Sequence, residues 1–142
     1  MITEWPWILA GSLRVFGVFW VAGGGFTLYV ARQSLFLDQV LETLSAEKED
    51  RLTSYFLAIG GGLTLLSGMG LALLSRWVFL PLLMSLLSQG VYFYLKHQRW
   101  INATTEDARA DAKVAQSTRN AFVVSCVVTV VTLWAWQLGL LR

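Results

Sequence analysis

Four long apolar runs constrain the fold of this chain more than any other feature of its sequence. The first covers residues 5–31 and contains a single charged residue, Arg14. The other three, residues 53–75, 77–95 and 120–141, contain no charged residue. A helix needs about 20 predominantly apolar residues to cross the roughly 30 Å of a bilayer's hydrocarbon core. Each run reaches or nearly reaches that length, so the sequence predicts four transmembrane helices.

The composition favours a membrane protein over a soluble bundle. Hydrophobic residues make up 56% of the 142 residues and charged residues 14%, whereas roughly a quarter of a typical soluble domain is charged. A helix of a soluble bundle keeps a polar face at its 3.6-residue period, but residues 55–75 carry only four polar side chains. We expect an all-α membrane protein, with a single four-helix transmembrane domain over residues 1–142. Its helices would form two helical hairpins with cytoplasmic helical extensions.

The distribution of cationic residues predicts the orientation, because short loops rich in Lys and Arg stay in the cytoplasm. Segments 32–52 and 96–119 hold eight Lys and Arg residues, against two or three on the side of the termini. We therefore expect loops 32–52 and 96–119 in the cytoplasm and both termini outside, in a bacterial inner membrane. The first residues lack a basic region before the first apolar run, so we expect no cleaved signal peptide.

Helical patterns continue into the first cytoplasmic segment. Residues 32–52 contain no Gly or Pro, and apolar residues recur there at helical spacing. This pattern predicts that the first helix continues to about Leu44. Ser45 has the properties of an N-cap for a new helix, in which Glu47 would pair with Arg51 one turn later.

The second cytoplasmic segment also contains a helix signal. Asn102 or Thr104 is expected to cap a helix whose first turn holds Glu106 and Asp107, because acidic residues stabilise the positive end of a helix. If this helix continues into the fourth span, the second extension is a helical hairpin that projects past the headgroups.

Small residues form the most conspicuous pattern within the spans. Six of them are candidates for helix packing: Gly23, Gly24, Gly25, Gly60, Thr64 and Gly68. The last three form one ridge with a spacing of four residues. Lipid offers no hydrophobic driving force for helix pairing, so close backbone approach must provide the attraction. The favoured interpretation is packing of the first helix against the second, and the alternative is a groove for a partner helix, a lipid or a pigment.

Arg14 is the one charge inside an apolar run, and no acidic residue occurs within the four spans. Charges in transmembrane segments are costly and often functional. Three fates are open. The side chain can snorkel to the outer headgroups, it can bond to polar partners such as Gln137 or Ser85, or it can pair with an anionic group of another subunit, a lipid or a substrate.

Gln89 is the second intramembrane candidate and lies with Ser85 and Ser88 in a polar patch of the third span. The fourth span adds hydroxyl groups at Ser125, Thr129 and Thr132. Hydrogen bonds between transmembrane helices average well under 1–2 kcal/mol each. Packing is therefore the favoured role of these groups, and an ion or solute route is the alternative.

Lys96 and Arg99 belong to a basic, amphipathic segment at the inner end of the third span. They are candidate contacts for anionic lipid headgroups, or else an ordinary cytoplasmic flank. His97 is the only histidine and Cys126 the only cysteine, which excludes a His-based metal site within one chain. With no catalytic motif present, we expect no catalytic residues, no cofactor and no metal.

These observations favour a non-catalytic multi-pass membrane protein that acts by helix–helix association. It would be an accessory or assembly subunit of a membrane complex, or a homo-oligomer, so its partners would be the lipid bilayer and other membrane subunits or itself. The alternative is a small homo-oligomeric channel or transporter that uses Arg14 and polar residues of the third and fourth helices. An enzyme ranks third, because acid–base groups would have to come from outside the spans. A net charge of +2 does not indicate a nucleic-acid partner.

Overall fold

The structure, a computed structural model, describes residues 4–45 and 51–142. Its elements are α1 (Trp5–Ser45), α2 (Leu52–Ala72), the short 3₁₀ helix η1 (Arg76–Val78), α3 (Phe79–Asn102), α4 (Glu106–Asp111) and α5 (Gln116–Gln137). Over the described residues the secondary structure is entirely helical. Four stretches are long and apolar enough to cross a membrane: Trp5–Leu44, Leu52–Ala72, Arg76–Asn102 and Glu106–Gln137. The predicted all-α class and the four span-length helices are confirmed.

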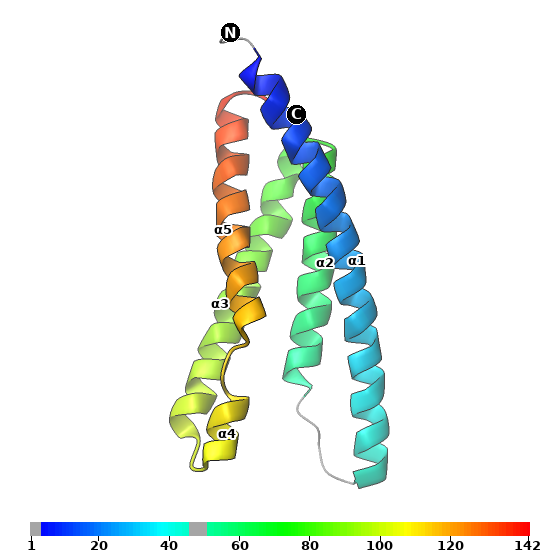
Figure 1. The fold of residues 1–142 in the computed structure, drawn as a ribbon, viewed down its shortest axis with the longest axis vertical. Helices are drawn as coiled ribbons and strands as arrows, with labels where there is room; N and C mark the ends of the chain where they lie inside the picture. Colours follow the sequence, from blue (N-terminus) through cyan, green and yellow to red (C-terminus); the bar gives the residue numbers. More distant parts are fainter. Residues whose placement is uncertain (1–3, 46–50) are drawn as a thin grey trace.

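The long helices lie roughly along one axis of an elongated molecule (Figure 1). α1 packs along α2, and α3 packs against α2 and α5. The start of α1 and the C-terminus lie toward one end of the long axis, which we call the terminal end. α4 and the last turns of α1 lie at the opposite end, which we call the α4 end.

α1 runs without a break to Ser45, so the prediction that the first helix continues to about Leu44 is confirmed. Its last turns contact the start of α2 through polar groups. The Ser54 hydroxyl donates a 2.6 Å hydrogen bond to Asp38, and Arg51 forms an ion pair with Glu42. The predicted cap at Ser45 and its helix, including the pair with Arg51, depend on residues 46–50, which lie outside the described ranges.

The helix predicted in the second extension exists, but its cap is neither Asn102 nor Thr104. Thr105 is the N-cap of α4, and its hydroxyl accepts a hydrogen bond from the Ala108 N–H. Thr105 has the extended backbone that a cap requires, whereas Asn102 is still the last residue of α3. α4 also ends before α5 begins, so no single helix continues from α4 into the fourth span.

Glycines bring the backbones of α1 and α2 into direct contact. A Cβ atom placed on Gly24 would lie 2.5 Å from the Leu65 nitrogen and 2.9 Å from the Gly61 oxygen. A Cβ on Gly17 would lie 2.8 Å from the Gly68 oxygen. Each of these positions admits no side chain larger than hydrogen without a shift of the backbone. These contacts agree with the favoured interpretation of the sequence, in which the first helix packs against the second.

The register of this contact differs from the ridge that the sequence suggested. Gly61 and Gly68 face α1, while a Cβ on Gly60 would meet nothing within 4 Å. Residues seven apart on a helix point within about 20° of each other, whereas residues eight apart diverge by about 80°. Gly60 and Gly68 therefore cannot both face one straight neighbour. A Cβ on Gly23 or Gly25 would likewise meet nothing within 4 Å, so of the triplet only Gly24 lies in the contact.

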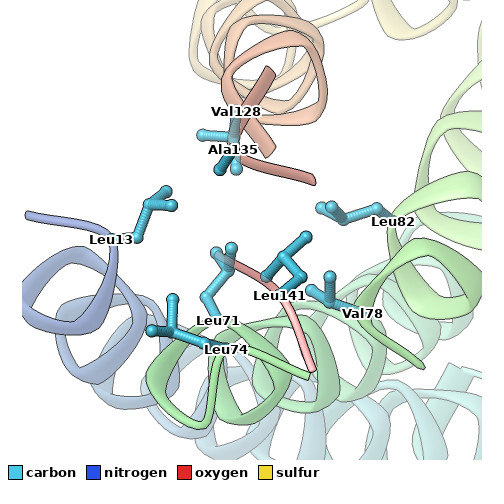
Figure 2. Close-up of a cluster of buried hydrophobic side chains, with 8 residues drawn as sticks. All are labelled: Leu13, Leu71, Leu74, Val78, Leu82, Val128, Ala135 and Leu141. Carbon is cyan, nitrogen blue, oxygen red and sulfur yellow. The ribbon is translucent and has the colours of Figure 1, made fainter. Parts of the chain in front are cut away.

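The apolar core joins α1, α2, α3 and α5 toward the terminal end. Figure 2 shows its eight buried side chains gathered around the last turn of α2: Leu13, Leu71, Leu74, Val78, Leu82, Val128, Ala135 and Leu141. Leu71, Val78, Leu82, Ala135 and Leu141 are each at most 1% exposed. The helix pair α1–α2 and the helix pair α3–α5 are therefore joined to each other at this end.

Two similar turns close the terminal end. After α2, the Ser75 N–H donates to the Gly70 carbonyl and Leu74 adopts a left-handed φ of 51°. After α5, the Leu140 N–H donates to the Ala135 carbonyl and Gly139 has a φ of 72°. Both are Schellman-type helix ends, but the first places a leucine where glycine is usual, at a cost of roughly 1–2 kcal/mol. Burial of the Leu74 side chain in the core offsets that cost.

The two turns are also bonded to each other. The Arg142 N–H donates a 2.8 Å bond to the Leu74 carbonyl, and the Arg76 N–H donates a 2.9 Å bond to the Arg142 carbonyl. We call this pair of hydrogen bonds the terminal bridge. It ties the segment after α5 to the turn between α2 and α3.

Candidate functional site

A buried polar stripe follows one face of α3. Ser85, Gln89, Tyr92 and Lys96 are all buried, and their spacing of four, three and four residues keeps them on one side of the helix. A buried polar group is costly unless it has a hydrogen-bond partner. The partners of these four groups therefore define what this face does.

Gln89 lies in the middle of the stripe and is 8% exposed. Its amide nitrogen donates to Ser85 Oγ at 3.3 Å and to Ser125 Oγ of α5 at 3.4 Å. Its carbonyl oxygen, Oε1, is buried and accepts no hydrogen bond from the described residues. Gln89 therefore joins α3 to α5 through its donor end and leaves its acceptor end unpaired.

Ser125 takes part in two hydrogen bonds beside this amide. The Ser125 hydroxyl donates a 2.9 Å hydrogen bond to the Ala121 carbonyl, and a hydroxyl has only one proton to donate. In this arrangement the oxygen of Ser125 accepts from Gln89, whose NH₂ group faces Ser125. The unpaired group is the carbonyl, and what it lacks is a hydrogen-bond donor.

Gln89 also lines an open cavity of about 280 Å³ between the four long helices, with exposed residues Ser117 and Ala121 at its rim. We call it the interhelical cavity. Its polar lining consists of Thr27 from α1, Thr64 from α2, Gln89 from α3, and Ser117 and Thr118 from α5. Its remaining lining residues are Phe56, Leu57, Gly60 and Ala121. Two members of the predicted small-residue ridge, Gly60 and Thr64, thus face this cavity.

Beyond the cavity, the stripe continues through an aromatic stack to Lys96. The rings of Tyr92 and Phe56 are stacked with centroids 3.9 Å apart, which links α3 to α2. The Lys96 ammonium donates a 2.9 Å hydrogen bond to the Asp111 carbonyl at the end of α4 and lies 5.8 Å from the centroid of the Tyr92 ring. Lys96 therefore holds α4 against α3.

This arrangement corrects the expected role of Lys96. The side chain is 7% exposed, so it is not available to a lipid headgroup. Arg99 is exposed and lines an open groove of about 510 Å³ between α3 and α4. Of the two predicted headgroup contacts, only Arg99 has the exposure that such a contact requires.

Arg14 lies at the other end of the molecule from this stripe. It lines a groove of about 600 Å³ together with Leu73, Leu74, Gly139 and Leu140, the residues that follow α2 and α5. Its side chain is exposed. The structure does not bring Arg14 together with Gln89, and the predicted partner Ser85 bonds Gln89 instead.

The hydroxyl groups of Thr129 and Thr132 in α5 are engaged with their own helix. Thr129 donates to the Ser125 carbonyl at 2.7 Å, and Thr132 donates to the Val128 carbonyl at 2.7 Å. Bonds of this kind satisfy a hydroxyl within an apolar helix without a partner element. Thr129 and Thr132 therefore do not extend the contact between Ser125 and Gln89.

Within residues 4–45 and 51–142, no three His, Cys, Asp or Glu residues come close enough to hold a metal ion. His97 stacks against Trp100 with an interplanar angle of 12°. Cys126 is half-buried with a free thiol.

Sequence reasoning identifies Gln89 and Ser85 but misses the rest of the stripe. The four-three-four spacing of Ser85, Gln89, Tyr92 and Lys96 is a helical period and is the available signal. The sequence places Lys96 at the membrane surface because basic residues at the end of a span usually lie there. Its burial depends on α4 folding back over α3, which the spacing alone does not indicate.

Comparison with models of protein families, with curated proteins and with solved structures finds no match to this chain.

Proposed function

We propose that the chain is a multi-pass membrane protein that acts by helix–helix association, as an accessory or assembly subunit of a membrane complex or as a homo-oligomer. The observation that carries this proposal is the surface of α1. Only 17% of its most apolar window is buried within the chain, although it is the longest helix. Val15, Phe19 and Phe26 are 73%, 73% and 68% exposed.

These three side chains share one side of α1. At 100° per residue, Val15, Phe19 and Phe26 fall within about 40° of one another, and Gly24 lies on the opposite side. We call this the outer face of α1. Because α2 already occupies the glycine side, a partner helix would approach the outer face. Lipid tails are as apolar as these side chains, so no hydrophobic driving force favours association in the membrane. Van der Waals packing against the partner helix would supply the attraction.

In this proposal the four long helices cross the membrane as two hairpins, with the terminal end outside and the α4 end in the cytoplasm. The position of Arg14 supports this arrangement. Arg14 lies beside Leu73 and Leu74, at the end of α2, and 17 uncharged residues separate it from Arg32. Seventeen helical residues span about 26 Å, close to the hydrocarbon thickness of a bilayer. Arg14 would then reach the outer headgroups rather than lie in the middle of the membrane.

The test is the copy number and the partners of the gently extracted protein. We expect more than one copy, or a co-purifying membrane subunit, when the chain is captured in nanodiscs from native membrane. The double variant Phe19→Ser, Phe26→Ser should lose this association and keep the fold, because its side chains are exposed. The matched control is Leu83→Ser, Leu87→Ser on the exposed side of α3, where the residues are 54% and 64% exposed.

A wild-type chain that is recovered as a stable single copy without any partner would overturn the association. The channel or transporter alternative has one supporting observation, the unpaired Gln89 carbonyl. Arg14 lines a different groove, and Thr129 and Thr132 bond their own helix, so of the proposed components only Ser125 meets Gln89. Solute flux into proteoliposomes that is abolished by Arg14→Leu would nonetheless establish that alternative.

A further inference from the structure

The exposed side of α1 carries a heptad pattern that runs along most of the helix. Its residues follow one another at alternating intervals of four and three positions, which is the repeat of helices that pair in a coiled coil. We call these residues the α1 seam: Phe19, Gly23, Phe26, Val30, Gln33, Leu37, Val40 and Leu44. Val30 is half-buried and the other seven are exposed. The outer face of α1 is therefore part of a longer stripe.

The α1 seam faces away from α2. Gly24 and Glu42 contact α2, the first through the backbone and the second through the ion pair with Arg51. At 100° per residue, Gly24 and Glu42 point in the same direction, and Phe26 and Leu44 point about 160° away from it. Figure 1 shows α1 at one edge of the bundle with α2 beside it. Packing within the chain thus leaves the seam uncovered.

The last part of the seam lies outside the apolar span. Leu44 follows twelve residues after Arg32, which is about 18 Å along the helix. In the insertion proposed above, Leu37, Val40 and Leu44 lie beyond the hydrocarbon layer, although they are 57%, 38% and 79% exposed. Water, unlike lipid, drives apolar side chains together, and a contiguous exposed apolar patch marks an interaction site. The hydrophobic effect therefore favours a partner along this part of α1.

The distribution of charge favours a second copy of the chain as that partner. If Leu37 is an a position and Val40 a d position, the e and g positions between residues 19 and 44 hold no charged residue. Charged e and g residues select different partners in coiled coils, and like charges would repel an identical copy. The seam has neither feature, so it is compatible with itself.

The membrane also determines how two copies would meet. Copies that follow the same distribution of cationic residues insert in the same orientation, so two α1 helices run parallel. In a two-fold symmetric pair, the same surface of each copy forms the interface. Each seam residue would then lie next to its equivalent in the second copy.

Gln33 is the one polar residue of the seam. It is exposed, and its amide nitrogen donates a 2.8 Å hydrogen bond to the Tyr29 hydroxyl. The NH₂ group has a second proton and the side-chain carbonyl is an acceptor, so the Gln33 side chains of two copies can bond each other. A single polar residue in a seam favours one register over those that leave it against apolar neighbours.

The seam is long enough for a stable pair. It spans 25 residue steps from Phe19 to Leu44, or about 38 Å. Its six large apolar side chains expose roughly 100 Å² each on average, given about 150–250 Å² for a whole aromatic side chain. Two copies would bury roughly 1,200 Å², the lower end of the range for specific, stable interfaces.

We propose that two copies of this chain pair through the α1 seam, as a parallel coiled coil that begins in the membrane and continues beyond the inner headgroups. The inference rests on the proposed function, for which it names the partner and the contact surface.

The first test is disulfide crosslinking of the full-length chain in native membranes. The background is Cys126→Ser, because Cys126 is a free cysteine. Single cysteines are introduced as Leu37→Cys, Val40→Cys and Leu44→Cys, and the matched control is Gln39→Cys, an exposed position about 140° around the helix from the seam. A disulfide requires Cα atoms within about 7 Å. We expect crosslinked dimers to form at least about tenfold faster at the three seam positions than at the control.

The second test places a charge in the seam. Leu37→Glu would bring two like charges together and remove two apolar side chains from the interface, so dimer affinity should fall about tenfold or more. The helix should persist, because Leu37 is 57% exposed. Gln39→Glu adds the same charge outside the seam and should leave the affinity unchanged. Energy transfer between labelled copies, measured as the protein is diluted in phosphatidylcholine vesicles, reports the affinity.

Two results would overturn the seam. One is crosslinking at position 39 that is as fast as at positions 37, 40 and 44. The other is a Leu37→Glu variant that dimerises as well as the wild-type chain. If further copies or another membrane subunit co-purify while the seam cysteines stay uncrosslinked, the seam is wrong and the proposed association stands. A single copy without any partner would overturn both.

Discussion

Backbone meets backbone between α1 and α2, whereas side chains meet between α3 and α5. In the first pair, Gly17 and Gly24 lie against carbonyl oxygens of α2 at distances that exclude any Cβ atom. In the second pair, the Gln89 amide bonds Ser125, and the rings of Phe93 and Phe122 meet edge to face with centroids 5.3 Å apart.

These two helix pairs illustrate two ways in which helices can associate where lipid provides no hydrophobic driving force. Close contacts at glycines are stabilised by dispersion attraction between the two helix backbones, and they leave no room for an added atom. Polar and aromatic contacts are fewer and more specific, and each can be lost singly. The stability of the α1–α2 pair should therefore fall sharply when side-chain volume is added. The stability of the α3–α5 pair should fall when a polar or aromatic side chain is removed.

The sharpest test of this contrast adds one methyl group inside the α1–α2 contact and one at an exposed position of α3. Gly24→Ala should destabilise the chain by about 3 kcal/mol, because the new Cβ would overlap backbone atoms that cannot rotate away. Gly90→Ala on α3 should have no such cost, since a Cβ there meets nothing within 4 Å. Unfolding by a denaturing detergent measures both free energies. Equal losses in the two variants would show that the α1–α2 contact tolerates an added atom as well as an exposed helix position does.

Lys96→Met should release α4 without loosening the long helices. The variant removes the hydrogen bond to the Asp111 carbonyl, and a hydrogen bond from a charged donor contributes roughly 1.5–3 kcal/mol. We expect faster amide exchange over residues 106–111 and little change elsewhere. Lys113→Met, at an exposed position, is the matched control. Unchanged exchange in α4 would show that Lys96 does not hold it.

Ser125→Ala should weaken the α3–α5 pair by about 1 kcal/mol, because the Gln89 amide loses one of its two acceptors. Thr129→Val should have a smaller effect, since the Thr129 hydroxyl bonds only its own helix. Thermal unfolding in detergent compares the two. A Thr129 variant that is as destabilised as the Ser125 variant would contradict the role given to the Gln89 contact.

The smallest effect is expected where the α1–α2 pair uses charge rather than glycine. Glu42→Gln breaks the ion pair with Arg51, whose side chains are 35% and 34% exposed. Exposed ion pairs contribute about 0–1 kcal/mol and are screened by salt. The loss should be under about 1 kcal/mol and should vanish in about 1 M salt. A larger loss of stability that salt does not reduce would show that the Glu42–Arg51 ion pair contributes more to the contact between α1 and α2 than an exposed ion pair does.

The sequence was sufficient to predict the helical class, the four apolar stretches and the length of α1, because these follow from local composition and period. It was not sufficient for the packing register. Gly60 and Gly61 are neighbours in the chain, but only the approach of α1 determines which of them is in contact. The burial of Lys96 likewise depends on α4 folding back over α3, and the open space beside Gln89 depends on all four long helices.

The terminal bridge places one connection between the two helix pairs near one end of the molecule. A rotation about that point moves distant atoms in proportion to their distance from it. For α5, whose 22 residues extend about 33 Å, a rotation of about 10° would carry the far end through about 6 Å. The Phe56–Tyr92 stack joins α2 to α3 toward the α4 end, so the bridge and the stack together oppose such a rotation.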